Sequence, residues 1–138
     1  MMLKPFNQKF GSGFGERSQE AIRCYGAHAY VACCAMCGAA SESILLATAI
    51  KKINDEQKVI KAYSGSNGRS RVENIVIGQA TARVQREFRG FTTLLKYWRD
   101  TSAHGHKTGI GDNESYTSLA MLLRFAIFSD DNWAELTN

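Results

Sequence analysis

The stretch that decides the fold is Ala29 to Ile53, which reads AYVACCAMCGAASESILLATAIKKI. It is apolar on nearly every side, contains no Pro, and ends with Lys51 and Lys52, two cations that suit a helix C-terminus. A helix that is apolar all round is buried among other helices instead of lying at a surface. We therefore expect one helix over residues 29–53 that forms the centre of a helical bundle.

A membrane span is the alternative for this stretch, because Glu42 is the only formal charge between Arg23 and Lys51. Ser, Gly, His and a charged Glu in the middle of the segment make insertion into a bilayer costly. We therefore predict a core helix here and no association with a membrane.

A second long helix follows in the second half of the chain. Its apolar residues recur in steps of three and four, a period that only a helix explains: Val72, Ile75, Val76, Ala80, Val84, Phe88, Phe91, Leu95 and Trp98. The pattern predicts one helix over residues 69–103, about 50 Å long, with a kink at Gly78 or Gly90. We expect Gly105 to end it.

Shorter helices are expected around these two. We predict them over residues 16–27, over residues 56–63 behind a cap at Asn54 or Asp55, and from Asp112 or Asn113 onward. No segment alternates between apolar and polar residues, so we expect no sheet. The predicted fold is all-α, an up-and-down bundle of about four to five helices, two of them long. Residues 1–15, which are rich in Gly, are expected as a flexible lead-in to a single domain over residues 16–138.

Composition and charge indicate what kind of partner the protein binds. The chain has 138 residues, 44% of them hydrophobic, and a formal charge of +4. Residues 58–107 carry ten Lys or Arg against three Asp or Glu, whereas residues 108–138 carry one against five. A basic block of this kind favours an anionic partner.

The cysteines and the start of the chain bear on location and metal binding. No apolar stretch of secretory type follows Met1, so we expect a cytoplasmic protein. Cys24, Cys33, Cys34 and Cys37 lie within 14 residues, but no second ligand pair and no suitable His spacing accompany them. We interpret them as free buried thiols, and we expect neither a metal nor a cofactor.

Polar chemistry is concentrated in residues 96–107, KYWRDTSAHGHK, at the end of the second long helix. Asp100 and His104 are four residues apart, so on a helix they share a face and the carboxylate can orient the imidazole. The structural alternative is a capping pair at a helix end, with Arg99 bound to a carboxylate. Glu42 is the first candidate for that carboxylate, because a buried acid needs a partner.

The segment from Arg99 to His104, RDTSAH, resembles the R-x-x-x-x-H motif of the HEPN superfamily, with the polar residue Asp100 directly after the Arg. The small-residue segment from Tyr30 to Glu42 also resembles a helix of that family. The similarity extends over about residues 16–136. It implies a helical bundle that dimerises so that two motifs share one cleft.

The resemblance implies a metal-independent endoribonuclease, often a toxin or a phage-defence component controlled by a partner antitoxin. By position, Arg99 and His104 are expected to be catalytic and Asp100 to assist. One branch of the family has, two residues after the His, a Tyr that the antitoxin modifies; here that position is His106, an auxiliary candidate together with Glu42.

The residue types fit such a reaction. Cleaving RNA without a metal requires a base, an acid and a cation beside the phosphorane, roles that His104 and Arg99 can fill. The expected phosphate-binding side chains are cationic and lie along the second long helix and just after it: Arg83, Arg86, Arg89, Lys96 and Lys107. Trp98 is expected in the core. The alternative function is a non-catalytic HEPN module that binds RNA, a nucleotide or a partner protein.

Overall fold

The computed structural model describes residues 3–103 and 109–138, and these residues form helices without any strand. A 3₁₀ helix, Lys4–Phe6, precedes eight α-helices within the described ranges. Their bounds are α1 Asn7–Phe10, α2 Ser12–Gly26, α3 Tyr30–Ile53, α4 Glu56–Ser64, α5 Gly68–Ile77, α6 Ala82–Ala103, α7 Asp112–Asp131 and α8 Trp133–Thr137. The prediction of an all-α fold is confirmed.

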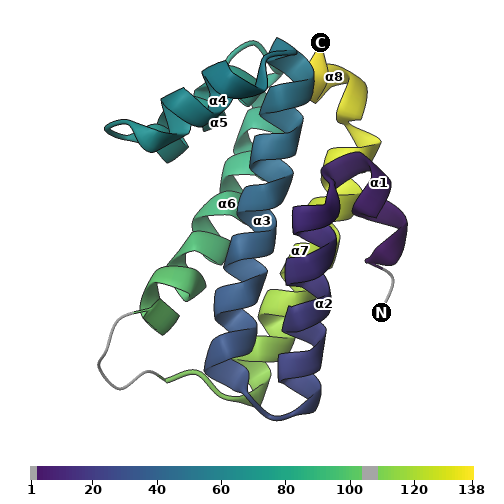
Figure 1. Cartoon of the computed structure of the whole chain (residues 1–138), viewed down its shortest axis with the longest axis vertical. Coiled ribbons are helices and arrows are strands. Elements are labelled where there is room, and N and C mark those ends of the chain that lie inside the picture. The colour runs from purple at the N-terminus through teal and green to yellow at the C-terminus, as the bar shows by residue number, and fades with distance from the viewer. Residues whose placement is uncertain (1–2, 104–108) are drawn as a thin grey trace.

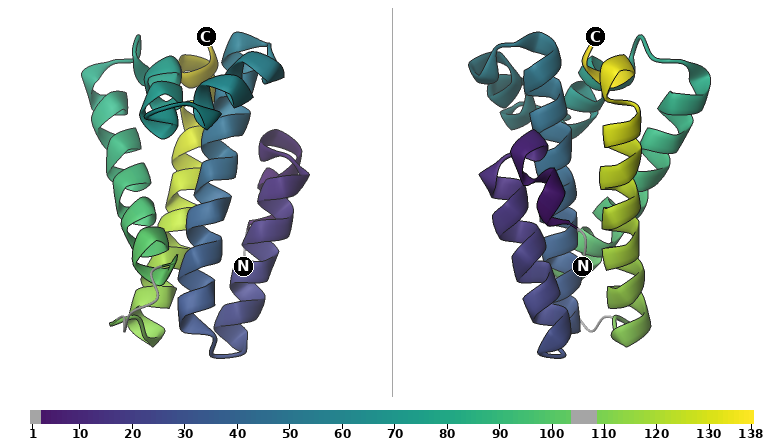
Figure 2. Two further views of the ribbon diagram at one scale, coloured as in Figure 1. Left: turned by 60° about the vertical axis from the view of Figure 1, so that its left-hand side comes forward. Right: turned by 90° about the vertical axis from the view of Figure 1, so that its right-hand side faces the viewer.

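Four helices, α2, α3, α6 and α7, run alternately down and up the molecule (Figure 1). Helix α3 lies between the other three and contacts each of them (Figure 2). Helices α4 and α5 form an arm beside the upper end of α3, and α8 lies at the same end (Figure 1). The position of α3 confirms its predicted place at the centre of the bundle.

The core is built from the inner faces of these helices. Fully buried side chains include Ile44 and Leu45 of α3, Phe88 of α6 and Phe125 of α7. The rings of Phe88 and Phe125 pack edge to face with centroids 5.2 Å apart, a geometry that aromatic pairs favour. Helix α3 is long and apolar enough to cross a membrane, but 56% of its most apolar window is buried inside this bundle.

The predicted single helix over residues 69–103 is wrong, because the chain forms two helices separated by residues 78–81. Thr81 Oγ1 accepts a hydrogen bond from the backbone N–H of Val84, which caps the start of α6, and the Thr81 N–H donates to Glu135 over 2.7 Å. Both α5 and α6 turn apolar residues toward the same core. The apolar period therefore continues across the turn and conceals it.

The expected flexible lead-in is also corrected. Residues 4–15 are helical except at Gly11, and the side chains of Leu3, Phe10 and Phe14 are buried. Phe10 packs against Phe14 and Trp133 with ring centroids 5.3 and 5.8 Å away. Gly11 has φ +92°, a value that favours glycine and lets the chain turn between α1 and α2. Burial of these apolar side chains outweighs the Gly-rich composition.

Other predicted boundaries hold. Helix α3 begins one residue after the predicted start, and Asp55 caps α4 by accepting a hydrogen bond from the backbone N–H of Lys58. Helix α7 begins at Asp112, where the Glu114 carboxylate accepts a hydrogen bond from the backbone N–H of Gly111. The prediction of four to five helices missed α1 and α8 and treated α5 and α6 as one helix, whereas the short helix α4 was predicted. The predicted stop at Gly105 lies outside the described residues.

Candidate functional site

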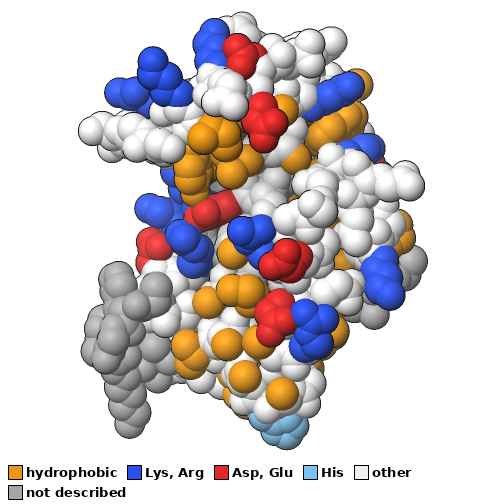
Figure 3. Space-filling model, in the orientation of Figure 1, with side chains coloured by type: hydrophobic (Ala, Val, Ile, Leu, Met, Phe, Trp, Pro, Cys, Tyr) orange, Lys and Arg blue, Asp and Glu red, His pale blue; other side chains and the backbone are white. Residues whose placement is uncertain are grey.

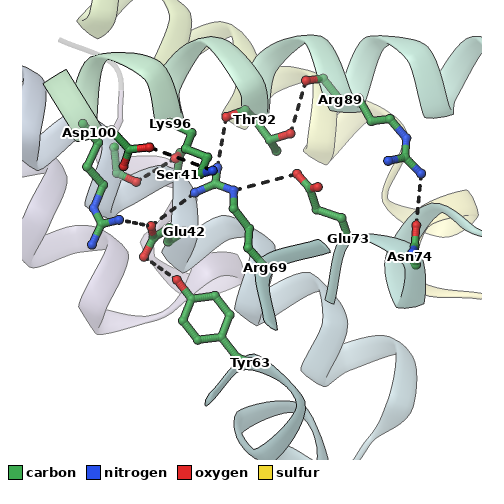
Figure 4. A network of polar contacts seen from close by, with 12 residues as sticks. Ser41, Glu42, Tyr63, Arg69, Glu73, Asn74, Arg89, Thr92, Lys96 and Asp100 are labelled. Atoms are coloured by element: carbon green, nitrogen blue, oxygen red, sulfur yellow. Dashed lines mark hydrogen bonds and ion pairs between the residues drawn. The ribbon is translucent and has the colours of Figure 1, made fainter. Parts of the chain in front are cut away.

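The site is centred on Glu42, in the middle of α3, whose carboxylate is bound from three directions. Tyr63 of α4 donates its O–H to Oε2 over 2.6 Å. Arg69 of α5 donates to Oε1 over 3.2 Å, and Arg99 of α6 lies 2.7 Å from the same oxygen. Figure 4 shows this network, in which α3, α4, α5 and α6 each supply one member. The predicted pairing of Glu42 with Arg99 is confirmed.

The close crossing of α3 and α6 brings Arg99 to Glu42. Gly38 lies one turn before Glu42 on α3, and a Cβ added there would be 2.3 Å from the Cβ of Arg99. Only a residue without a side chain permits this approach. The small-residue character of α3 at this point therefore positions the Arg99 guanidinium over the carboxylate.

Arg69 and Arg99 differ in exposure, although they share one carboxylate oxygen. The Arg69 side chain is only 15% exposed, and it also donates to the backbone oxygen of Thr92 and lies 3.9 Å from Glu73. The Arg99 side chain is 42% exposed, whereas that of Glu42 is 14% exposed. Arg69 is therefore a largely buried structural link between α5 and α6, and Arg99 keeps part of its guanidinium open to a ligand.

Burial and the hydrogen bond to Glu42 raise the pKa of Tyr63 to about 12. A phenol with such a pKa stays protonated at neutral pH and keeps donating to the carboxylate. Tyr63 thus supplies one of the three donor groups around the Glu42 carboxyl group, beside the two guanidiniums.

Asp100, the predicted assisting residue, lies one residue beyond Arg99 and is half-buried. Its Oδ2 is 3.9 Å from Nζ of Lys96, one turn earlier on α6. Ser102 donates its O–H to the backbone oxygen of Arg99 over 2.8 Å. His104, His106 and Lys107 lie outside the described residues, so the expected Asp100–His104 pairing stays a prediction.

The predicted phosphate-binding side chains of α6 are exposed, but most of them already have polar partners. Arg83 pairs with Glu87 over 2.8 Å and also donates to Asn132. Arg89 donates to the side chain of Asn74 over 3.1 Å. Arg86 is exposed. Charged side chains of both signs lie side by side below the α4–α5 arm in Figure 3, so this face of the molecule is mixed instead of uniformly basic.

The four cysteines are free, and all except the half-buried Cys24 are buried. Burial raises the pKa of Cys34, whose sulfur lies 3.4 Å from the Ser118 hydroxyl. A hydrogen bond from Cys37 lowers the pKa of Cys33 and, as its counterpart, raises that of Cys37. Among the residues that the structure describes, no three His, Cys, Asp or Glu side chains gather to hold a metal ion.

Sequence reasoning missed Tyr63, Arg69 and Glu73 as parts of the site. The need of Glu42 for a partner was visible in the sequence, but one carboxylate accepts several donors and the sequence pointed to Arg99 alone. Arg69 lies in the segment that was predicted to be continuous with α6. Once the chain turns at residues 78–81, α5 lies against α6 and Arg69 reaches both Glu42 and Thr92. Trp98, expected in the core, is half-buried.

Comparison of the chain with protein-family models, with characterised proteins and with solved structures finds no match. The class that the fold itself defines is therefore an all-α helical bundle with a carboxylate-centred, arginine-rich network where α3 crosses α6.

Proposed function

We propose that this protein is a cytoplasmic, metal-independent endoribonuclease of HEPN type that acts as a homodimer. The observation that supports it most directly is the Arg99 guanidinium, fixed on one side by Glu42 and 42% exposed on the other. A cation held in place and still open to solvent suits the stabilisation of a transition state with growing negative charge. Arg99 is also the first residue of the R-x-x-x-x-H segment.

In the proposed reaction the 2′-oxygen of a ribose attacks the adjacent phosphorus and the bond from phosphorus to the 5′-oxygen breaks. His104 of one chain takes the proton from the 2′-hydroxyl, and His104 of the other chain gives a proton to the departing 5′-oxygen. Arg99 donates to the phosphoryl oxygens. Asp100 assists by orienting the imidazole. The products are a 2′,3′-cyclic phosphate and a free 5′-hydroxyl.

The biological setting is part of the proposal. A ribonuclease of this type fits a toxin or a phage-defence component, held in check by an antitoxin or another partner protein. Because His106 stands where one branch of the family has a modified Tyr, control by modification of that Tyr does not apply to this chain. Arg83, Arg86, Arg89, Lys96 and Lys107 are proposed to contact RNA phosphates.

The second candidate is a non-catalytic module that binds RNA, a nucleotide or a partner protein. It is favoured by the ion pairs on α6. Glu42 offsets much of the Arg99 charge, Glu87 pairs with Arg83, and Asp100 lies near Lys96. Such pairing suits a structural or binding surface as well as a catalytic one.

The experiment is cleavage of single-stranded RNA by the purified protein at low salt with EDTA present. We expect cleavage by the natural chain and a loss of at least about 100-fold in Arg99→Ala and in His104→Ala. Arg99→Lys is expected to lose most of the activity too, since Lys lacks the planar pair of donors.

The matched control is Lys58→Ala, because Lys58 is exposed on α4 and its side chain takes no part in the network. Intact RNA in every sample, with binding equal in natural and variant chains, would reject the nuclease and support the binding module. Cleavage that persists in both Arg99→Ala and His104→Ala would also reject the assigned roles.

A further inference from the structure

A pocket of about 220 Å³ lies between α5 and α6, beside the network and nearer to the N-terminal end of α6 than Arg99. Its lining is polar, with hydroxyl, cationic and carboxylate groups: Arg69, Ser70, Glu73, Thr92, Thr93 and Lys96. Except for Lys96, none of these residues was expected to bind a ligand.

Three side chains give this pocket hydrogen-bond donors for a ligand. The hydroxyls of Ser70 and Thr93 are on exposed residues and have no polar partner within the described part of the chain. Lys96 is 53% exposed, and its Nζ lies 3.9 Å from Asp100, too far for a strong hydrogen bond. By contrast, the Thr92 hydroxyl already donates to the Arg89 carbonyl oxygen.

The charges around the pocket select an anion. Glu73 is the only carboxylate in the lining, and Arg69 lies against it at 3.9 Å with both side chains nearly buried. Lys96 then contributes a cation that is only weakly paired. Two hydroxyl donors and an ammonium group around a small polar cavity are the donor set that binds phosphate oxygens.

We propose that this pocket binds a backbone phosphate of single-stranded RNA, one that neighbours the phosphate held at Arg99. This inference rests on the proposed function, which supplies the ligand class. Thr93 and Arg99 are six residues apart on α6, about 9 Å along the helix axis and about 120° around it. Lys96 lies between them in the sequence. A strand that winds around this part of α6 can therefore place different phosphates at the two positions, whereas a single inorganic phosphate is too small to reach both.

The first test uses inorganic phosphate and backbone amide NMR. Phosphate is expected to shift the amide signals of Ser70 and Thr93. Lys96→Gln and Thr93→Val should each weaken that binding about fivefold or more, since each removes one donor. Glu73→Gln should strengthen it, because a negative charge leaves the lining while Glu42 and the Thr92 carbonyl still hold Arg69 in place.

The matched control is Lys58→Gln, which removes one exposed lysine of α4 and should leave phosphate binding unchanged. All these positions except Glu73 are exposed or partly exposed, and equal thermal unfolding curves verify that each variant folds. If phosphate does not shift the amide signals of Ser70 and Thr93, the proposal that this pocket binds phosphate is wrong. It is also wrong if Lys58→Gln weakens phosphate binding as much as Lys96→Gln does.

The second test measures binding of single-stranded RNA in the His104→Ala background as salt is varied. Lys96→Gln is expected to weaken RNA binding severalfold and to reduce the slope of log affinity against log salt by about 0.7. Phosphate binding with an unchanged RNA slope would also overturn the proposal, because the pocket would then hold a free anion and no RNA phosphate.

The two proposals fail in different ways. If Lys96→Gln and Thr93→Val weaken RNA binding but the natural chain does not cleave RNA, the nuclease proposal is rejected and the pocket proposal stands. If the natural chain cleaves RNA but Lys96→Gln, Thr93→Val and Lys58→Gln all bind RNA equally well, the nuclease proposal stands and the pocket proposal is rejected.

Discussion

At the scale of single residues, the most informative feature is a carboxylate in the middle of an otherwise uncharged helix. An unpaired charge there would be costly, so Glu42 needs a partner wherever the helix is buried. That argument gave Arg99 from the sequence, and the pairing is confirmed. It did not give Tyr63 or Arg69, because the number of donors around an acid depends on which helices lie beside it.

Glu42→Ala tests the energetic weight of this network. The substitution leaves Arg69, which is only 15% exposed, without its main partner, and this destabilises the folded state. Arg99 adds less to the loss of stability, because its side chain is 42% exposed and water can solvate it. We expect the free energy of unfolding to fall by about 2–3 kcal/mol, measured by urea denaturation.

Glu87→Ala is the comparison for that measurement. It also breaks an arginine–carboxylate pair, but both side chains of that pair are well exposed. The expected loss is about 0–1 kcal/mol. Equal losses in the two variants would show that Glu42 is not held in a low-dielectric setting.

At the scale of helices, the crossing of α3 and α6 depends on Gly38. The two helices approach so closely that a methyl group at this position would overlap the Arg99 side chain. Glycine in a helix interior costs about 1 kcal/mol relative to alanine, so packing outweighs propensity here.

Gly38→Ala is therefore expected to destabilise the protein by about 1–3 kcal/mol in thermal or urea unfolding, despite the better helix propensity of Ala. On α6, Gly90 offers the opposite case, since an added Cβ would meet no atom within 4 Å. Gly90→Ala is expected to stabilise the fold by about 0.5–1 kcal/mol. The same sign for both variants would contradict the close crossing.

The helical state of α5 and α6 was predictable from the sequence, but the turn between them was not. The period of three and four residues identifies α5 and α6 as helical because it reports which side of each faces apolar neighbours. It carries no information about the direction of the chain. The turn at residues 78–81 rests on Thr81, whose side chain caps α6 and whose N–H reaches Glu135 from the far end of the chain.

At the scale of the whole molecule, the proposed nuclease requires two chains, because one His104 cannot act as base and acid at once in a single step. A symmetric dimer presents the same patch twice. We expect the natural protein to sediment as a dimer at micromolar concentration.

Mixing variants tests whether the cleft is shared. When the natural chain and the His104→Ala chain are unfolded together and refolded as a mixture, RNA cleavage should fall with the square of the natural chain's share of the mixture. A mixed dimer has one His104 and therefore lacks either the base or the acid. A monomer in sedimentation, or cleavage that falls only in proportion to that share although mixed dimers form, would contradict the shared cleft.

The sequence by itself determined the helical class, the central place of α3, the caps at Asp55 and near Asp112, and the need of Glu42 for a cationic partner. These follow from the period of apolar residues, from local hydrogen bonding and from the cost of a buried charge, all of which act over a few residues along the chain. Only the tertiary structure decided the rest, namely the ordered N-terminal helices, the turn that separates α5 from α6, and the meeting of Tyr63, Arg69 and Arg99 at one carboxylate. Those features depend on contacts between residues far apart in the sequence, such as Phe10 with Trp133 and Gly38 with Arg99. No local pattern encodes such contacts, because they form only when the helices pack.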